Sequence, residues 1–262
     1  MNIQFILKGK RIQLKCDDRD LFERIRLEFS VKNPNKRHSR FAQDRLYAIT
    51  PLGSFKPGLL KDILTAIKGI DVKINVDIPQ EVLDTAFPCN VVPDRLLEVS
   101  ASGFESRDYQ EESVRLALKY GRGVILLATS AGKSFVIYNL IINLWKYHKK
   151  TKVLLMVPNT QLVRQMYDDI LDYGCFKGEV CKFGSSNKVL NEDANIIISN
   201  RQWLEGHSSD LPEIGISIVD EVHGLTKKSK CGAFIESLDT NLKFGFTGTM
   251  PTDMENYWNV IG

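Results

Sequence analysis

The distribution of apolar and polar residues divides the chain into two parts. In residues 1–77, short runs of alternating polarity such as 72–76 are interspersed with apolar residues at helical spacing. From residue 105 onward, almost uninterrupted apolar runs such as 152–157 alternate with helical segments. Alternating polarity is typical of half-exposed strands, and continuous apolar runs are typical of strands buried in a parallel sheet. We therefore expect an α+β domain followed by an α/β domain.

The first part predicts a β-β-α-β-α-β order within residues 1–77. Aspartates precede the first helix and a glycine follows the second, which are common start and stop signals. The expected strands are 3–7, 11–15, 46–50 and 72–76, and the expected helices are 17–29 and 59–67. Together they form a small α+β domain. Residues 78–104, which contain Pro79, Pro88 and Pro93, are expected to be a linker or a segment that wraps between the domains.

The second part, residues 105–262, predicts an α/β domain with a doubly wound parallel sheet. Five apolar strands are separated by helices, and this order favours parallel pairing. The expected strands are 123–127, 152–157, 194–198, 214–219 and 243–247, and the expected helices are 108–119, 135–147, 160–171 and 202–204. Ligands of such sheets bind at the carboxyl ends of the strands.

The stretch between the first of these strands and the next helix resembles a phosphate-binding loop. Residues 128–134 read Ala-Thr-Ser-Ala-Gly-Lys-Ser, close to G-x-x-x-x-G-K-[ST], with Leu127 at the first glycine position. Backbone N–H groups of such loops surround phosphate oxygens at a helix N-terminus. In this reading Lys133 reaches the β- and γ-phosphates and Ser134 binds magnesium. The candidate nucleotide-binding residues are Thr129, Ser130, Ala131, Gly132, Lys133 and Ser134. By itself the loop leaves open a Gly-Lys-Ser that merely begins a helix.

Two carboxylates follow the apolar strand at 214–219. Asp220 would hold magnesium, directly or through water, and Glu221 would orient and deprotonate the attacking water. A strand that ends in a charged turn is the alternative. The two motifs together, each at a strand end, favour nucleotide hydrolysis over that alternative. ATP and Mg²⁺ are therefore the expected cofactors.

Asp220-Glu221-Val222-His223 resembles the DExH box of superfamily 2 helicases, and other motifs of that family stand in the right order. The resemblance covers about residues 104–250 and implies a RecA-like P-loop NTPase domain. Thr247-Gly248-Thr249 resembles motif III, which implies that Thr247 and Thr249 couple hydrolysis to movement. In the family the histidine lies between the nucleotide and motif III, so His223 joins Glu221 and Lys133 as a catalytic candidate; otherwise it is a turn histidine.

Three further segments carry the resemblance. Arg107-Asp108-Tyr109-Gln110 is similar to the Q motif, which implies that Arg107 and Gln110 contact adenine and that Phe104 stacks on it. Residues 157–165 resemble motif Ia and residues 198–202 lie where a later nucleic-acid motif stands. Motif Ia implies strand-phosphate contacts by Pro158, Asn159, Thr160 and Arg164. The phosphate loop departs from the family at Ala128 and at Ser130, where a side chain replaces a glycine hydrogen.

Charge is unevenly distributed along the chain. The net charge is +3, but residues 1–90 carry 16 Lys and Arg against 11 Asp and Glu, whereas residues 91–262 carry 19 against 21. A basic leading domain indicates a polyanionic partner. The acid-free run 32–40 is its candidate contact, either with nucleic acid or merely as a solvated loop. Its basic residues are Lys32, Lys36, Arg37 and Arg40.

Composition places the chain in a cellular compartment. Hydrophobic residues make up 43% and charged residues 26% of the 262 positions, as in ordinary soluble proteins. No apolar run reaches the ~20 residues of a membrane span, and the first residues do not form a signal peptide. The five cysteines lack Cys-x-x-Cys or zinc spacing. We expect a cytoplasmic protein with reduced thiols and no membrane partner, in the host cytoplasm if the source is a phage.

The resemblance implies an ATP-dependent DNA helicase or translocase. A small basic domain before such a core most resembles phage helicases that remodel branched DNA in recombination, replication and repair. Superfamily 2 motors use two RecA-like domains, and the second supplies an arginine finger. The chain ends shortly after the third motif, so we expect a leading domain plus the first motor domain, weakly active or inactive alone. The residues leave open an RNA helicase, a nucleotide-switched binding module and a restriction-enzyme motor subunit.

Overall fold

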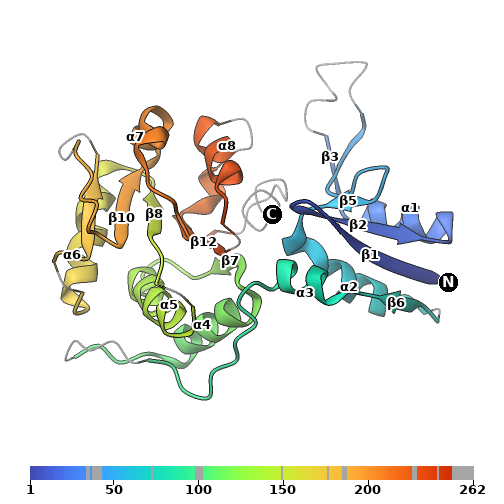
Figure 1. The fold of residues 1–262 in the computed structure, drawn as a ribbon, viewed down its shortest axis with the longest axis horizontal. Helices are drawn as coiled ribbons and strands as arrows, with labels where there is room; N and C mark the ends of the chain where they lie inside the picture. The colour runs from blue at the N-terminus through green and yellow to red at the C-terminus, as the bar shows by residue number, and fades with distance from the viewer. Residues whose placement is uncertain are drawn as a thin grey trace.

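The computed structural model describes residues 1–33, 36, 43–71, 73–97, 103–148, 150–175, 177–184, 188–225, 229–240 and 242–249. They form two lobes that lie side by side (Figure 1). The small lobe comprises residues 1–87 and contains a four-stranded sheet, and the large lobe comprises residues 103–249 and contains a six-stranded sheet. This arrangement agrees with the predicted α+β and α/β classes.

The sheet of the small lobe is mixed, with strand order β5-β2-β1-β6. The central strand β1 (Asn2–Lys8) pairs antiparallel with β2 (Arg11–Cys16) and parallel with β6 (Asn75–Asp77), and β5 (Ser54–Phe55) lies at the other edge. Alternate residues of β1 and β2 enter the core. The buried residues of this face are Ile3, Phe5, Ile12 and Leu14.

In the part of the small lobe that the structure describes, the α-helices are α1 (Arg19–Glu28), α2 (Leu60–Lys68) and α3 (Gln80–Ala86). A 3₁₀ turn, η2 (Pro57–Leu59), precedes α2. The side chain of Asp18 caps α1 by accepting a hydrogen bond from the Leu21 N–H, and Gly69 ends α2. Both ends agree with the start and stop signals in the sequence.

Two strands of this lobe differ in position from the predicted ones. In place of a strand at 46–50 the structure has a two-stranded ribbon, β3 (Ser30–Lys32) and β4 (Arg45–Tyr47), which lies outside the main sheet. In place of 72–76, β6 begins at Asn75, because its pairing with Asn2 sets the register. A strand this short is defined by its partner more than by its own residues.

The prediction of a linker at 78–104 was wrong for its first part. Helix α3 belongs to the small lobe, because Val82 and Ala86 are buried in its core. The sequence Ile-Pro-Gln-Glu places Pro79 just before the helix, which is a common helix start signal. Residues 88–97 do wrap: the N–H of Val91 donates to the Leu118 carbonyl (3.2 Å), and the N–H of Leu97 donates to Oδ1 of Asn143 (2.8 Å).

The sheet of the large lobe has six parallel strands in the order β7-β12-β11-β8-β10-β9. Five of them match the predicted strands, and β9 at one edge was missed because it is short and carries a lysine. The strands are β7 (Arg122–Leu126), β8 (Val153–Val157), β9 (Val180–Phe183), β10 (Ile196–Asn200), β11 (Ile216–Asp220) and β12 (Leu242–Thr247).

Helices cover both faces of this sheet. One face packs against α4 (Asp108–Tyr120), α5 (Lys133–Tyr147) and α6 (Thr160–Asp172). The other packs against α7 (Arg201–His207) and α8 (Lys230–Ser237), of which α8 was not predicted. Two 3₁₀ turns, η3 (Ser208–Asp210) and η4 (Val222–Gly224), follow α7 and β11.

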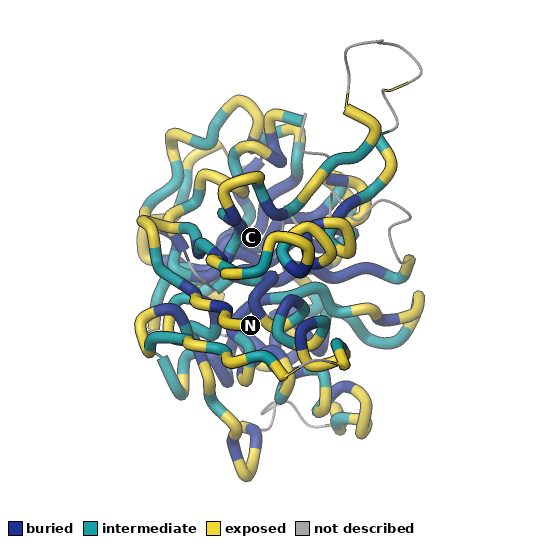
Figure 2. The backbone as a smooth tube through the Cα atoms, turned by 90° about the vertical axis from the view of Figure 1, so that its right-hand side faces the viewer, coloured by how far each residue is buried: buried dark blue, intermediate teal, exposed yellow. Residues whose placement is uncertain are grey.

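The continuous apolar runs are explained by this three-layer arrangement. Ile196 and Ile198 enter the core beneath α5 and α6, whereas Ile197 enters the core beneath α7 and α8. Every residue of β8, β10 and β11 is buried. Figure 2 shows that the buried stretches of the backbone gather in the interior and the exposed ones at the periphery. Strands covered on both sides require apolar residues at odd and even positions alike.

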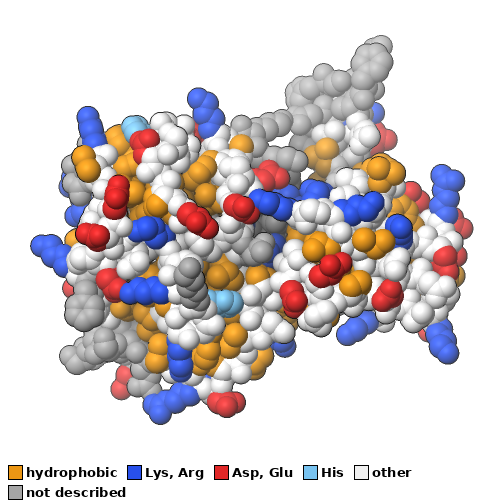
Figure 3. Space-filling view, in the orientation of Figure 1, with side chains coloured by type: hydrophobic (Ala, Val, Ile, Leu, Met, Phe, Trp, Pro, Cys, Tyr) orange, Lys and Arg blue, Asp and Glu red, His pale blue; other side chains and the backbone are white. Residues whose placement is uncertain are grey.

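Charged side chains join the two lobes, as Figure 3 shows along their boundary. Lys10 pairs with Asp239 (2.6 Å), and Lys56 pairs with Glu236 (2.8 Å). The buried guanidinium of Arg122, at the start of β7, donates to the carbonyl oxygen of Thr85 in α3 (3.2 Å). The small lobe therefore contacts the strand that leads into the phosphate loop.

No helix of the described residues is long and apolar enough to cross a membrane. All five cysteines are free thiols, and four of them are buried, as expected for core residues. Burial raises the pKa of Cys89, Cys175 and Cys231 to about 11, so these thiols are not reactive thiolates near neutral pH.

Candidate nucleotide-binding site

Three neighbouring strands deliver the predicted motifs to one edge of the sheet. The phosphate loop follows β7, Asp220 ends β11 and Thr247 ends β12, which lies between them. Because the strands are parallel, their carboxyl ends meet at the same edge. The structure therefore brings together motifs that are about a hundred residues apart in the chain.

The side chain of Gln110 in α4 contacts the phosphate loop through a hydrogen bond. The Nε2 of Gln110 donates to the carbonyl oxygen of Ala131 (2.9 Å), and its Oε1 accepts from the N–H of Arg107 (3.0 Å). Gly132 has φ +76°, and a Cβ there would lie 2.6 Å from that Nε2. The glycine is needed for both the backbone conformation and the close approach. Ser130 adopts φ +66°, a sparsely populated conformation for a residue with a side chain.

Lys133 lies between the two carboxylates. Its ammonium group forms an ion pair with Oε1 of Glu221 and lies 3.9 Å from Oδ1 of Asp220. The side chain of Lys133 is only 16% exposed, so its ammonium group is largely shielded from solvent. It is the first residue of α5, and the helix N-terminus and the carboxylates together surround it.

Asp220 has the chemistry of a metal ligand. Burial raises the pKa of its carboxyl group, and the nearby charge of Lys133 acts in the opposite direction. Its Oδ1 is buried and accepts no hydrogen bond from the described residues. A desolvated carboxylate oxygen of this kind suits a hard divalent cation such as Mg²⁺. The described residues contain no group of three or more His, Cys, Asp and Glu that could hold a metal alone, so phosphate and water would have to complete its coordination.

Glu221 connects to Thr247 through His223. The Nδ1 of His223 lies 3.2 Å from Oε2 of Glu221 and 2.8 Å from Oγ1 of Thr247. The buried Thr247 hydroxyl donates to the carbonyl oxygen of Thr249 (2.9 Å) and accepts from the Thr249 N–H (3.1 Å). The DExH and motif III segments are thus one hydrogen-bonded network.

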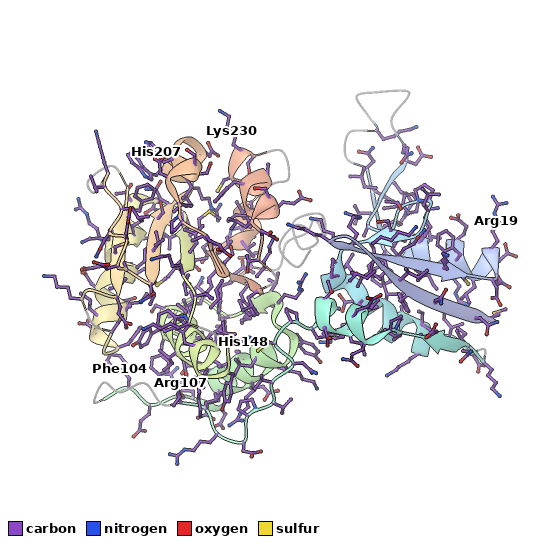
Figure 4. All side chains as sticks on the ribbon, in the orientation of Figure 1. Arg19, Phe104, Arg107, His148, His207 and Lys230 are labelled. Atoms are coloured by element: carbon purple, nitrogen blue, oxygen red, sulfur yellow. The ribbon has the colours of Figure 1, made fainter. Side chains whose placement is uncertain are left out.

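Aromatic rings gather beside the loop. The ring of Phe104 stacks on Phe135 (6.0 Å between centroids) and meets Tyr173 edge-on (4.9 Å). Figure 4 shows Phe104 and Arg107 at the same edge of the large lobe, opposite His207 and Lys230. The guanidinium of Arg107 donates to the hydroxyl of Tyr109 (3.1 Å). Both Phe104 and Arg107 are exposed and available to a ligand.

Ser134 differs from its expected orientation. Its hydroxyl lies 2.8 Å from the hydroxyl of Tyr173 and is also bonded to the carboxylate of Asp169, whose pKa is raised chiefly by burial. The predicted metal ligands Ser134 and Asp220 are therefore not paired with each other here. Tyr173 and Asp169 were not candidates, because a tyrosine at the end of an amphipathic helix carries no motif of its own.

The candidate nucleic-acid residues fall in two places. Asn159, Thr160 and Arg164 are exposed and half-exposed Pro158 precedes them, where β8 passes into α6. In the basic run, Lys32 is exposed at the end of β3, and Lys36 pairs with Asp44 (2.9 Å), so its charge is partly neutralised. Arg37 and Arg40 lie outside the described residues.

The fold and these motifs define a superfamily 2 helicase motor domain. The chain belongs to the ResIII family, whose model is described as the res subunit of type III restriction enzymes, because that model matches residues 103–252, more than half of the chain. The resemblance read from the DExH box and its neighbours is thereby confirmed.

Relatives are known by sequence and by structure. The ATP-dependent DNA helicase uvsW of Enterobacteria phage T4 is 29% identical over 160 residues, which cover 59% of this chain and 32% of that helicase. The DNA 3'-5' translocase XPB2 of Sulfurisphaera tokodaii is 28% identical over 162 residues, 57% of this chain and 30% of that protein. This chain thus spans about a third of the length of these curated relatives.

Two solved structures share the fold. A crystal structure of the bacteriophage T4 UvsW helicase aligns with all of this chain and 98% of that one, with a TM-score of 0.72 and 21% identity. The Sulfolobus solfataricus SWI2/SNF2 ATPase core, solved in complex with dsDNA, aligns with 64% of this chain and 37% of that one, with a TM-score of 0.55 and 16% identity. The first alignment covers both lobes, so the small lobe belongs to the shared architecture.

Proposed function

We propose that this chain forms the leading domain and the first motor domain of an ATP-dependent DNA helicase or translocase that remodels branched DNA. The observation that carries the proposal is the position of Lys133 between Asp220 and Glu221, at the carboxyl edge of a parallel sheet. The small lobe, residues 1–87 with α3 included, would be the DNA-binding leading domain, and residues 105–262 would be the motor domain. The wrapping residues 88–97 would join them.

The phosphate loop would bind the β- and γ-phosphates. Backbone N–H groups of Thr129 to Ser134 and the N-terminus of α5 favour an anion at this position. The phosphates would compete with Glu221 for Lys133, because both are anions and the lysine has one ammonium group. Asp220 would hold Mg²⁺, with Ser134 after its hydroxyl leaves Tyr173. When bound, the cation would neutralise charge that develops on the transferred phosphoryl group.

Glu221 would act as the base that orients and deprotonates the attacking water. His223 keeps the carboxylate of Glu221 in place after Lys133 turns to the phosphates, since its Nδ1 lies 3.2 Å from Oε2. Through the same ring the site reaches Thr247 and Thr249. This network would report the state of the nucleotide to the motif III segment.

The residues beside the aromatic cluster of Phe104, Phe135 and Tyr173 would recognise the adenine base. Phe104 presents an exposed ring on which adenine stacks, and Arg107 presents donors for its ring nitrogens. Gln110 would act on adenine less than on the loop, because its amide is 5% exposed and bonded on both sides.

DNA is the proposed polymer because the named relatives are DNA helicases or translocases. Backbone contacts would come from Pro158, Asn159, Thr160 and Arg164, and from Lys32, Lys36, Arg37 and Arg40 in the leading domain. Such contacts bind strands without reading sequence. We place this activity in the cytoplasm, which in a phage protein is that of the host.

The test is turnover and strand separation by the full-length protein. ATP hydrolysis stimulated by DNA, with unwinding of a branched DNA junction, supports the proposal. Equal or greater activity on an RNA duplex would favour an RNA helicase. Nucleotide-dependent DNA binding without strand movement would favour a nucleotide-switched binding module.

A further inference from the structure

Arg201 lies directly behind the turn that carries Glu221. It is the first residue of α7, and its Nη2 donates hydrogen bonds to the backbone carbonyl oxygens of Asp220 (3.1 Å) and Glu221. Its sequence position lies in the segment expected to contact nucleic acid. In the structure, however, the side chain is directed to the catalytic turn, where it is half-buried.

The turn that Arg201 contacts has an unfavourable backbone. Glu221 has φ +50° and ψ +49°, the left-handed conformation, which residues with a side chain adopt rarely. The Gly224 N–H also donates to the Glu221 carbonyl oxygen (3.0 Å), so two donors converge there. A conformation of this kind persists when surrounding contacts hold it.

The space for the guanidinium is provided by Gly224. A Cβ on Gly224 would lie 2.4 Å from Nη1 of Arg201. The backbone at the start of α7, from which Arg201 extends, is fixed as well. Oδ1 of Asn200 caps this helix, and Nδ2 of Asn200 donates to Oγ1 of Thr160 (3.1 Å). The arrangement is therefore built from three segments of the sheet edge, those that follow β8, β10 and β11.

We propose that Arg201 is a positioning residue for ATP hydrolysis, which holds the strained turn so that Glu221 faces the attacking water. This inference rests on the proposed function. Arg201 touches no reacting atom, and it acts through the carbonyl groups on either side of the Glu221 N–H. Loss of the guanidinium should therefore reduce kcat and leave nucleotide affinity, which depends on the phosphate loop, nearly unchanged.

The experiment is a double-mutant cycle in the full-length protein with Arg201→Ala, Gly224→Ala and the combined variant. Each single variant should lower kcat of the ATPase by about tenfold or more, with the Kd for Mg-ATP within about twofold of wild type. Gly224→Ala displaces the flexible end of Arg201, so it should have no further effect once Arg201 is alanine. Coupled sites behave in this non-additive way.

Two controls separate positioning from folding. Gly206→Ala adds a Cβ in open space on α7 and should leave kcat unchanged. Arg201→Lys keeps the positive charge and should recover part of the lost kcat. Thermal unfolding should show similar Tm values for all variants.

The outcomes distinguish this inference from the proposed function. Wild-type turnover that persists in Arg201→Ala, additive effects of the two substitutions, or a parallel loss of kcat and nucleotide affinity would each overturn the positioning role alone. An inactive wild-type protein would overturn the proposed function and this inference with it.

Discussion

The charged groups of the candidate nucleotide site and those of the β3–β4 ribbon differ in how far they are exposed to solvent. At the site, Lys133 comes from the loop after β7 whereas Asp220 and Glu221 come from the end of β11, and the three side chains are 16%, 9% and 29% exposed. On the ribbon, Lys36 and its partner Asp44 come from one segment and are 44% and 81% exposed. Both regions are rich in ions, yet only the first removes them from solvent.

This difference in exposure indicates different roles: the shielded charges suit catalysis, and the exposed charges suit long-range attraction of a polyanion. Desolvated charges interact strongly at short range and shift one another's pKa values, as Lys133 does for Asp220. Exposed charges are screened by salt within about 10 Å and contribute little individually, although several of them attract a polyanion. Substitutions in the first region should therefore change turnover and binding sharply, and those in the second should change salt dependence gradually.

The largest effect is expected at Glu221. In the full-length protein, Glu221→Gln should retain ATP but lower kcat by ~10²–10⁴, the usual contribution of a general base. Asp220→Asn should also weaken Mg²⁺-dependent ATP binding, because it removes the buried carboxylate that we propose holds the cation. Binding by calorimetry with and without Mg²⁺, beside steady-state turnover, measures both. The same pattern of defects in the two variants would show that the carboxylates do not divide these tasks.

Lys133→Ala should have the next largest effect. Loss of a charge-assisted contact to phosphate should weaken ATP binding by about 10- to 100-fold. Asp220 and Glu221 then lose their ammonium partner, so the pKa of Asp220 should rise further. Calorimetry of the 262-residue chain tests this, with the exposed Lys230→Ala of α8 as the matched control. Unchanged affinity in Lys133→Ala would refute the loop assignment.

Lys243 provides a buried charge away from the nucleotide. It is 5% exposed and pairs in register with Arg122, and burial lowers its pKa from 10.5 to about 8. Below pH 8 the lysine is charged in both states and the native state bears the full desolvation cost. Between pH 8 and 10.5 the unfolded chain binds more protons, so stability should rise, by up to about 3 kcal/mol.

Urea unfolding at pH 7.5 and pH 10 should detect this contribution. Lys243→Met should reduce the rise relative to wild type, whereas the exposed Lys68→Met should not. An identical pH response of wild type and Lys243→Met would mean that the lysine is not effectively desolvated.

The smallest effect is expected on the basic run. Replacing Lys36, Arg37 and Arg40 by alanine should lower the slope of log affinity against log salt by up to ~3, about one per lost phosphate contact. The ion pair of Lys36 with Asp44 makes its share the smallest. A salt titration of junction DNA binding compares the triple variant with wild type. Parallel lines would indicate a solvated loop without a nucleic-acid partner.

The motifs were readable from sequence because their signals are local. The strand, the Gly-Lys-Ser and the helix after it are contiguous, and Asp220 directly follows an apolar run. The structure confirms β7, α5 and β11 and brings their ends together. The roles of these residues in hydrolysis stay predictions.

Elements stabilised by distant partners were not readable. Strand β9 and helix α3 are short, and each is stabilised by contacts with a sheet or core elsewhere in the chain. The displacement of β6 has the same origin, since its register depends on β1 at the other end of the lobe. Local propensity is too weak to define such elements.

The sequence by itself determined the two fold classes, the strand-end positions of the motifs and the membership in a helicase family, because each depends on neighbouring residues or on a short pattern. Only the tertiary structure decided that the Lys133 ammonium lies between two carboxylates, that the Ser134 hydroxyl contacts Tyr173, and that Arg201 lies behind Glu221. These contacts join segments that the order of strands in the sheet places side by side, and no local pattern encodes that order.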